Sequence, residues 1–189
     1  MTSRTTEITD THRFSAEAYH RMGEAGVFGE QRVELLYGKI VDRSPIKSNH
    51  AGTVNELIRH LSLHLQHEAY VFTAQNPIHL DDYSEPEPDI SILQYRSDLY
   101  KRSHPTAEET VVLIEVADSS LEKDRDIKLP LYASHGIPEV WIVNLQDMQI
   151  ERYRSPGPKG YTDIHIFLPG DEIATDFMKA VEVSAVLGV

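Results

Sequence analysis

The chain has 189 residues, of which 40 % are hydrophobic and 25 % charged, and this length and composition suit one globular domain with a sizeable core. Its lack of cysteine excludes disulfides, thiolate zinc sites and cysteine nucleophiles. The formal charge of −12 opposes nucleic-acid binding, because lysine and arginine supply most of the affinity for phosphates, unless a local basic strip lies away from the acidic loops.

Residues 1–13 are polar and carry no apolar pattern, which predicts a loose N-terminal arm ahead of a single domain over residues 14–189. The start of the chain lacks the apolar core of a secretory signal. No uninterrupted apolar stretch is long enough to span a bilayer. We therefore expect a cytoplasmic protein that does not insert into membranes.

The first half of the chain predicts two helices around a hairpin. Ser15 can cap a first helix that Gly26 ends, and residues 32–41 predict a hairpin that turns near Gly38. The clearest helix covers residues 48–69, because at 100° per residue five apolar side chains fall on one stripe that should face the core. These five are Val54, Leu57, Ile58, Leu61 and Leu65.

Four histidines lie on this second helix. His50 projects onto the apolar face, whereas His60, His64 and His67 lie to one side, at spacings that could hold a metal. A solvated helix flank is the simpler interpretation of those three, because no carboxylate or further ligand accompanies them. His50 fits a hydrogen-bonded histidine at the edge of the core equally well.

The second half of the chain is rich in strands. They are predicted at residues 71–80, 90–95, 111–117, 140–145, 149–154 and 161–168, with a short terminal segment at 181–187. Asp118-Ser119-Ser120 can cap a helix over residues 121–135, which Pro130 must kink unless it marks a late start. We expect an α/β fold with a mixed sheet flanked by helices, in which residues 111–145 form a right-handed parallel crossover.

Acidic residues accompany three of these elements. Asp89 stands directly before an apolar strand, Glu115 lies within the next one, and Glu34 begins the hairpin. An ionised carboxylate near a core is costly unless it is paired or bound to a metal. Two acidic oxygen ligands with Lys128 nearby are what a hard cation such as Mg²⁺ needs to activate water against a phosphodiester. The pattern therefore predicts phosphoryl chemistry.

Each of these residues also has a purely structural interpretation. Asp89 follows a proline and could be a turn residue, and Glu115 could be a buried acid paired with Arg32 or Lys128. A lysine in the position of Lys128 is most often a solvent-exposed helix residue. Tyr132, one turn further on, fits packing or hydrogen-bond support better than chemistry.

Five motifs occur in a recognisable order along the chain. They are Glu34-Leu-Leu-Tyr-Gly-Lys-Ile, Pro-Asp89-Ile, Ile-Glu115-Val-Ala-Asp-Ser-Ser, Asp124-Arg-Asp-Ile-Lys128-Leu-Pro-Leu-Tyr132 and Gly136-Ile-Pro-Glu-Val-Trp141-Ile-Val. From about Phe14 to the C-terminus, the chain resembles the Uma-type putative restriction endonuclease family, a bacterial family of largely unknown function. The resemblance implies a restriction-endonuclease-like PD-(D/E)XK core.

The resemblance also implies roles for individual residues. Asp89, Glu115 and Glu34 would hold Mg²⁺ or Mn²⁺, and Lys128 would be the catalytic lysine, with Lys123 as its local competitor. In the usual motif the lysine stands two residues after the second acid, where this chain has alanine, and the family places the amine on the following helix instead. We expect removal of Lys128 to abolish cleavage with folding nearly intact, and removal of Lys123 to be nearly neutral.

Three functions are compatible with this pattern. The first is a Mg²⁺-dependent endonuclease acting on DNA, favoured if Lys39, Arg43 and Lys47 flank the carboxylates. The second is a catalytically inactive nuclease-like binding module, which the acidic balance favours. The third is a hydrolase of a small phosphorylated molecule, which the charge does not penalise. Since duplex cleavage commonly needs two active sites, a homodimer is expected.

Overall fold

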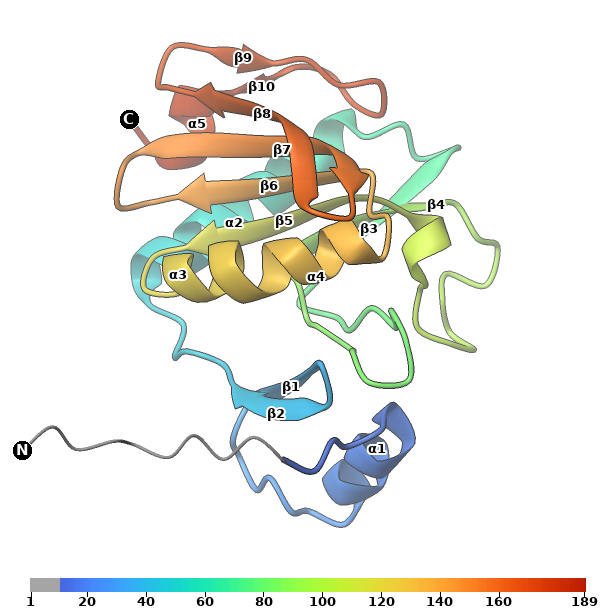
Figure 1. The fold of residues 1–189 in the computed structure, drawn as a ribbon. Helices are drawn as coiled ribbons and strands as arrows, with labels where there is room; N and C mark the ends of the chain where they lie inside the picture. Colours follow the sequence, from blue (N-terminus) through green and yellow to red (C-terminus); the bar gives the residue numbers. More distant parts are fainter. Residues whose placement is uncertain (1–10) are drawn as a thin grey trace, which may run out of the picture.

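The computed structural model describes residues 11–189, so positions 1–10 of the predicted arm lie outside the described residues. At its centre is a six-stranded mixed sheet in the order β3-β4-β5-β6-β7-β8 (Figure 1). The strands are β3 (Tyr70–Ala74), β4 (Ile90–Gln94), β5 (Thr110–Ala117), β6 (Glu139–Asn144), β7 (Gln149–Gly157) and β8 (Gly160–Phe167). The predicted α/β fold with a mixed, helix-flanked sheet is confirmed.

The pairing of β5 with β6 is parallel, and the other neighbouring strands of this sheet pair antiparallel. A helical run connects β5 to β6, as a parallel pair requires. This run consists of α3 (Leu121–Lys123), the π-helix η2 (Asp124–Lys128) and α4 (Leu129–Ser134). The predicted strand–helix–strand unit with parallel strands is therefore present.

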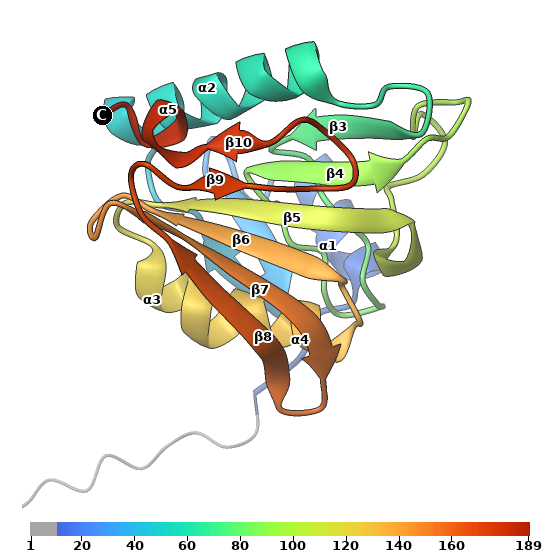
Figure 2. The ribbon, with the colours of Figure 1, turned by 90° about the horizontal axis from the view of Figure 1, so that it is seen from above.

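Two apolar layers enclose the sheet (Figure 2). One face packs against α2 (Ser48–His64), α5 (Val183–Leu187) and the short hairpin β9 (Glu172–Ile173) and β10 (Val181–Glu182). The other face packs against the helical run that follows β5. Of the predicted stripe on α2, Val54, Leu57, Leu61 and Leu65 are buried and Ile58 is partly buried, as the helical periodicity requires.

The first helix and the hairpin form a separate layer beside the main sheet (Figure 1). α1 (Ala16–Glu24) begins at Ser15, whose hydroxyl accepts the Ala18 N–H, so the predicted cap is confirmed. β1 (Val33–Leu36) and β2 (Lys39–Asp42) are joined by Tyr37 and Gly38, both with positive φ. Gly38 has a second reason to be glycine, because a Cβ there would lie 2.7 Å from Arg13 Cβ.

Several element boundaries differ from those that the sequence predicts. α2 ends at His64 rather than Ala69, because the chain turns extended at Leu65 and the next N–H bonds to the carbonyl of Phe177. β3 ends at Ala74, because Gln75 adopts a φ of 54°. The predicted helix or loop near residues 97–108 contains one 3₁₀ turn, η1 (Ala107–Glu109).

The helix after β5 departs from a regular α-helix. Ser120 stands at its N-cap but makes no capping hydrogen bond, so the predicted cap is wrong in detail. The π-helical turn of η2 directly precedes Pro130, which lacks the N–H that a regular helix would use there. The predicted effect of Pro130 thus takes the form of a wider turn rather than a late start. Among the helices of residues 11–189, none has the length and hydropathy that a membrane crossing requires.

Glu151 on β7 is a buried carboxylate with several donors. It accepts hydrogen bonds from Arg125, from Tyr153 at 2.6 Å and from Asn144 at 3.0 Å. Burial acts to raise the pKa of Glu151, but these donors outweigh it and lower the pKa to about 2. The ionised form is therefore favoured in the folded protein.

We expect Glu151→Gln to lower the free energy of unfolding by about 2 kcal/mol at pH 7, because it removes an ionised acceptor. Since the folded pKa is depressed, the contribution exists above the ordinary value of 4.5 and is lost as the pH falls toward 2. Urea denaturation at pH 7, 4 and 3 should show the two proteins converging. Glu172→Gln, at an exposed position, is the control, and a constant difference between Glu151→Gln and wild type would refute the assignment.

Candidate active site

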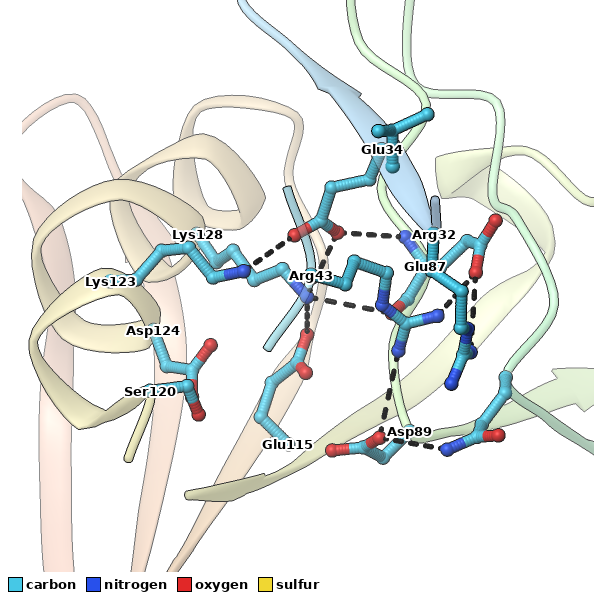
Figure 3. A network of polar contacts seen from close by, with 12 residues as sticks. Arg32, Glu34, Arg43, Glu87, Asp89, Glu115, Ser120, Lys123, Asp124 and Lys128 are labelled. Carbon is cyan, nitrogen blue, oxygen red and sulfur yellow. Dashed lines mark hydrogen bonds and ion pairs between the residues drawn. The ribbon is translucent and has the colours of Figure 1, made fainter. Parts of the chain in front are cut away.

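A pocket lies where the hairpin β1–β2, the strands β4 and β5 and the helical run meet (Figure 3). Acidic and basic side chains from these elements line it together. They include Arg32, Arg43, Lys47, His50, Asp89, Glu115, Asp118, Lys123, Asp124 and Lys128. Three of the four predicted catalytic residues therefore face one pocket, although they are far apart in the sequence.

Asp89 and Glu115 reach this pocket from neighbouring strands. β4 and β5 run antiparallel with Ile90 opposite Ile114, so the residue before Ile90 stands opposite the residue after Ile114. The backbone N–H of Val116 donates to Asp89 Oδ2 at 2.9 Å, which fixes the aspartate beside β5. Strand register alone thus brings the two predicted metal ligands to the same end of the sheet.

Glu115 is buried together with Lys128 and Tyr132. The Lys128 ammonium at 3.0 Å and the Tyr132 hydroxyl at 2.6 Å both donate to Oε1 of Glu115. Burial, helped by the charges of Asp124 and Asp89, raises the pKa of Glu115 to about 8, although Lys128 acts to lower it. Burial thus favours the protonated form of this carboxyl group and Lys128 favours the ionised form, while Tyr132 gives the hydrogen-bond support expected of it.

Lys128 is only 2 % exposed, so the alternative prediction of a solvent-exposed helix lysine is wrong. Its Nζ also lies 3.1 Å from Oε2 of Glu34. Burial alone would lower the pKa of Lys128, but Glu115 and Glu34 outweigh it and raise the pKa. The amine is therefore held in its charged form between two carboxyl groups.

Glu34 is fully buried and binds two lysines. Lys123 Nζ lies 3.0 Å from Oε1, and the backbone N–H of Glu87 donates to Oε2 at 3.2 Å. Burial acts to raise the pKa of Glu34, but Lys128 and Lys123 lower it. The two lysines that the sequence presents as competitors thus share one carboxylate, because the π-helical turn brings residues five apart to the same side.

Asp89 has partners from two other elements. His50 Nε2 lies 3.1 Å from Oδ2, and Arg43 Nη2 lies 3.7 Å from Oδ1. Burial acts to raise the pKa of Asp89, but the contact with His50 and the N–H of Val116 lower it. Within residues 11–189, Nδ1 of His50 is buried and has no hydrogen-bond partner. His50 is therefore the hydrogen-bonded histidine at the core edge that the sequence suggests, and it also lines the pocket.

Sequence reasoning missed Glu87 and the pairings of the outer part of the network in Figure 3, although it named the basic residues Arg32 and Arg43 in other connections. Arg43 binds Glu87, and Arg32 lies 3.8 Å from the same carboxylate oxygen. The Ser120 hydroxyl donates to Asp124 Oδ2 at 2.6 Å, and burial raises the pKa of Asp124. For Glu87 the signal is the alternation of glutamate and proline before β4, since two prolines hold that segment extended beside the hairpin.

No group of three or more His, Cys, Asp or Glu side chains within residues 11–189 is arranged to hold a metal ion. The three-carboxylate set implied by the resemblance is therefore not assembled, because lysines engage Glu34. Asp89 and Glu115 do offer the oxygen donors that a hard cation prefers, and both face the pocket. Their charges repel each other, since the charge of Asp89 helps to raise the pKa of Glu115. A cation would offset this repulsion, and ligation by this pair stays a prediction.

The sequence also offers His60, His64 and His67, on the flank of α2, as a possible metal site. These histidines likewise do not form a group that could hold a metal ion. The rings of His60 and His64 meet edge to face with centroids 4.6 Å apart. Burial lowers the pKa of His60, which favours its neutral form. The ring of His67 is exposed and lies 3.3 Å from the carbonyl of Ser62.

Comparisons with known proteins agree with this fold. The model of the family Uma2, described as putative restriction endonuclease, matches residues 16–185. Among solved structures, a putative nuclease belonging to DUF820 from Anabaena variabilis ATCC 29413 aligns with a TM-score of 0.67 and 12 % sequence identity, over 93 % of this chain and 98 % of that chain. At this identity the structural likeness supports the fold alone. The search of curated proteins found no match.

Proposed function

The chain belongs to the Uma2 family of putative restriction endonucleases, and from this we propose that it is a Mg²⁺-dependent or Mn²⁺-dependent endonuclease that hydrolyses DNA phosphodiester bonds. One observation carries the proposal: Asp89 and Glu115 face one pocket, with the buried ammonium of Lys128 beside them. Ionised or ionisable groups are costly to bury in this way. Their concentration at a pocket is typical of a functional site.

Each acidic or basic residue of the site has its own role in the proposed reaction. Asp89 and Glu115 would hold the cation, which when bound polarises a phosphoryl oxygen and lowers the pKa of its water. Lys128, whose charged form is favoured by Glu34 and Glu115, stabilises negative charge that develops on the phosphoryl group. Glu34 positions Lys128 and Lys123 rather than binding the metal.

Basic side chains around the pocket support a nucleic-acid substrate despite the net charge of −12. Of the three basic residues singled out in the sequence, Arg43 and Lys47 line the pocket, whereas Lys39 does not. Lys123 adds a further ammonium group to the lining. A local concentration of positive charge can bind phosphates even on an acidic protein.

A second candidate function is a nuclease-like module that binds without cleaving. The observation in its favour is that acids already engage the pocket cations: Arg43 binds Glu87, Lys47 lies 3.2 Å from Asp118, and Lys123 binds Glu34. Cations so paired offer less charge to a phosphate backbone.

A cleavage assay separates these functions. We expect wild type to cut supercoiled plasmid or single-stranded DNA with Mg²⁺ or Mn²⁺ and not with EDTA, and the Asp89→Ala/Glu115→Ala double variant to be inactive. Asp126→Ala, an exposed acid on the same helical run, is the matched control. Hydrolysis of a small phosphodiester with no cutting of DNA would instead favour a small-molecule hydrolase. If neither substrate is hydrolysed while DNA is retained in a binding assay, the binding module is the better account.

A further inference from the structure

Strand β8 is an edge of the central sheet with which no strand of residues 11–189 pairs on its outer side. Figure 2 shows it at one end of the fan of strands. An open edge presents unpaired N–H and C=O groups to other chains, and most edges are protected by proline, lysine or a bulge. Residues 161–168 contain neither proline nor lysine, so this edge lacks those two protections.

Two large apolar side chains of β8 are exposed in alternation. Ile164 is 56 % exposed and Ile166 is 52 % exposed, and both lie on the same face of the strand. The opposite edge of the sheet differs, because every residue of β3 is partly buried. A strand with strong β-propensity and exposed isoleucines at an open edge is suited to pairing with another strand.

We propose that β8 pairs antiparallel with β8 of a second copy of this chain, about a two-fold axis through Ile164. The two sheets then form one continuous sheet. In this register Ile164 stands opposite the partner's Ile164, Asp163 opposite the partner's His165, and Thr162 opposite the partner's Ile166. Opposite residues in antiparallel strands place their side chains on the same face, where they contact one another.

Charge complementarity favours β8 of a second copy as the partner strand at this edge, and it favours this pairing register. The two contacts of Asp163 with Arg154, at 2.8 and 3.0 Å, both use Oδ2, so neither of them engages Oδ1. His165 is exposed on the same face of the strand. Because Asp163 and His165 are symmetric about Ile164, one two-fold axis forms two acid–imidazole contacts at once.

A neighbouring register lacks this complementarity. An axis through His165 would set two imidazoles against each other and place Asp163 opposite Phe167. The proposal does not depend on the proposed nuclease activity, because no residue of β8 lines the pocket. Loss of dimerisation and loss of cleavage can therefore be observed separately.

Sedimentation of the full chain tests the dimer. We expect wild type to approach twice the monomer mass of 21.5 kDa as its concentration rises. Ile164→Lys should sediment as a monomer at the same concentrations, because the axis brings two ammonium groups together. Leu63→Lys, at an exposed leucine of α2, should behave as wild type. A monomeric wild type, or equal dissociation in both variants, would overturn the proposal.

Cysteine cross-linking tests the register, since the chain has no cysteine of its own. Ile164→Cys should form a disulfide-linked dimer on mild oxidation, because opposite Cα atoms lie about 4.5–5.5 Å apart. Ile166→Cys should not form one, because in the proposed register the two cysteines at position 166 lie four residues apart along the strands, about 13 Å. Circular dichroism melting confirms that each variant is folded. Preferential cross-linking of His165→Cys, or no cross-linking of Ile164→Cys, would overturn the proposed pairing.

Discussion

Lys128→Met is expected to destabilise the protein by about 3–5 kcal/mol and to reduce DNA cleavage by at least about 10²-fold. The stability loss follows because Lys128 is buried between Glu34 and Glu115, and its removal leaves Glu115 without a cation and Glu34 with Lys123 alone. The loss of cleavage follows because the ammonium lines the pocket beside both predicted ligands. The sequence alone predicts nearly intact folding for this change, and the burial of the lysine reverses that expectation.

Urea denaturation gives the stability change, and plasmid cleavage is compared at a temperature where circular dichroism shows every variant folded. Lys123→Met is the matched control, because it loses the bond to Glu34 while Lys128 stays in place, and about 1 kcal/mol is expected. Tyr132→Phe removes one hydrogen bond to Glu115 and keeps the charge. Wild-type stability in Lys128→Met, or a larger loss of cleavage in Lys123→Met, would refute the role assigned to Lys128.

Millimolar Mn²⁺ is expected to raise the melting temperature of wild type by about 5–10 °C. A ligand at a hundred times its dissociation constant adds about 2.7 kcal/mol, and in a chain of this size each kcal/mol shifts the midpoint by about 2–4 °C. The physical cause is the repulsion between Asp89 and Glu115, which contributes to the raised pKa of Glu115 and which a bound cation would relieve. Differential scanning fluorimetry with and without the metal measures the shift.

The metal shift should depend on pH with a definite sign. Because burial raises the pKa of Glu115 to about 8, a proton competes with the cation below that pH. The shift should therefore be larger at pH 8.5 than at pH 6.5. Asp89→Asn/Glu115→Gln, which keeps both side-chain shapes, should show no shift at either pH. An equal shift in this double variant would assign the stabilisation to another site.

Much of the fold follows from local patterns in the sequence. The runs of β-branched residues around Asp89 and Glu115 predict β4 and β5, and the apolar stripe on residues 48–65 predicts α2. Once β4 and β5 pair, register alone sets these two acids opposite each other. The core of the candidate site is therefore a consequence of short-range periodicity and one strand pairing.

The rest depends on contacts that no local pattern encodes. The sharing of Glu34 by two lysines requires both the hairpin layer and the π-helical turn, and neither spacing rule nor propensity predicts such a turn. The binding of Arg43 to Glu87 joins residues 44 positions apart. β9 is a two-residue strand that forms only because β10 returns beside it.

The π-helical turn of η2 makes the length of this segment as informative as its residues. A π turn holds one residue more than an α-helical turn, and each residue of an α-helix rotates the next side chain by about 100°. In a regular α-helix two residues five apart would differ in direction by about 140°, so Lys123 and Lys128 lie on one side only because of the π turn. Deleting one residue between them would place them four apart on a regular helix, which is again one face. A related chain that lacks the extra residue therefore presents the same two amines from positions four apart, and related chains are best aligned by the number of residues here before identities are compared.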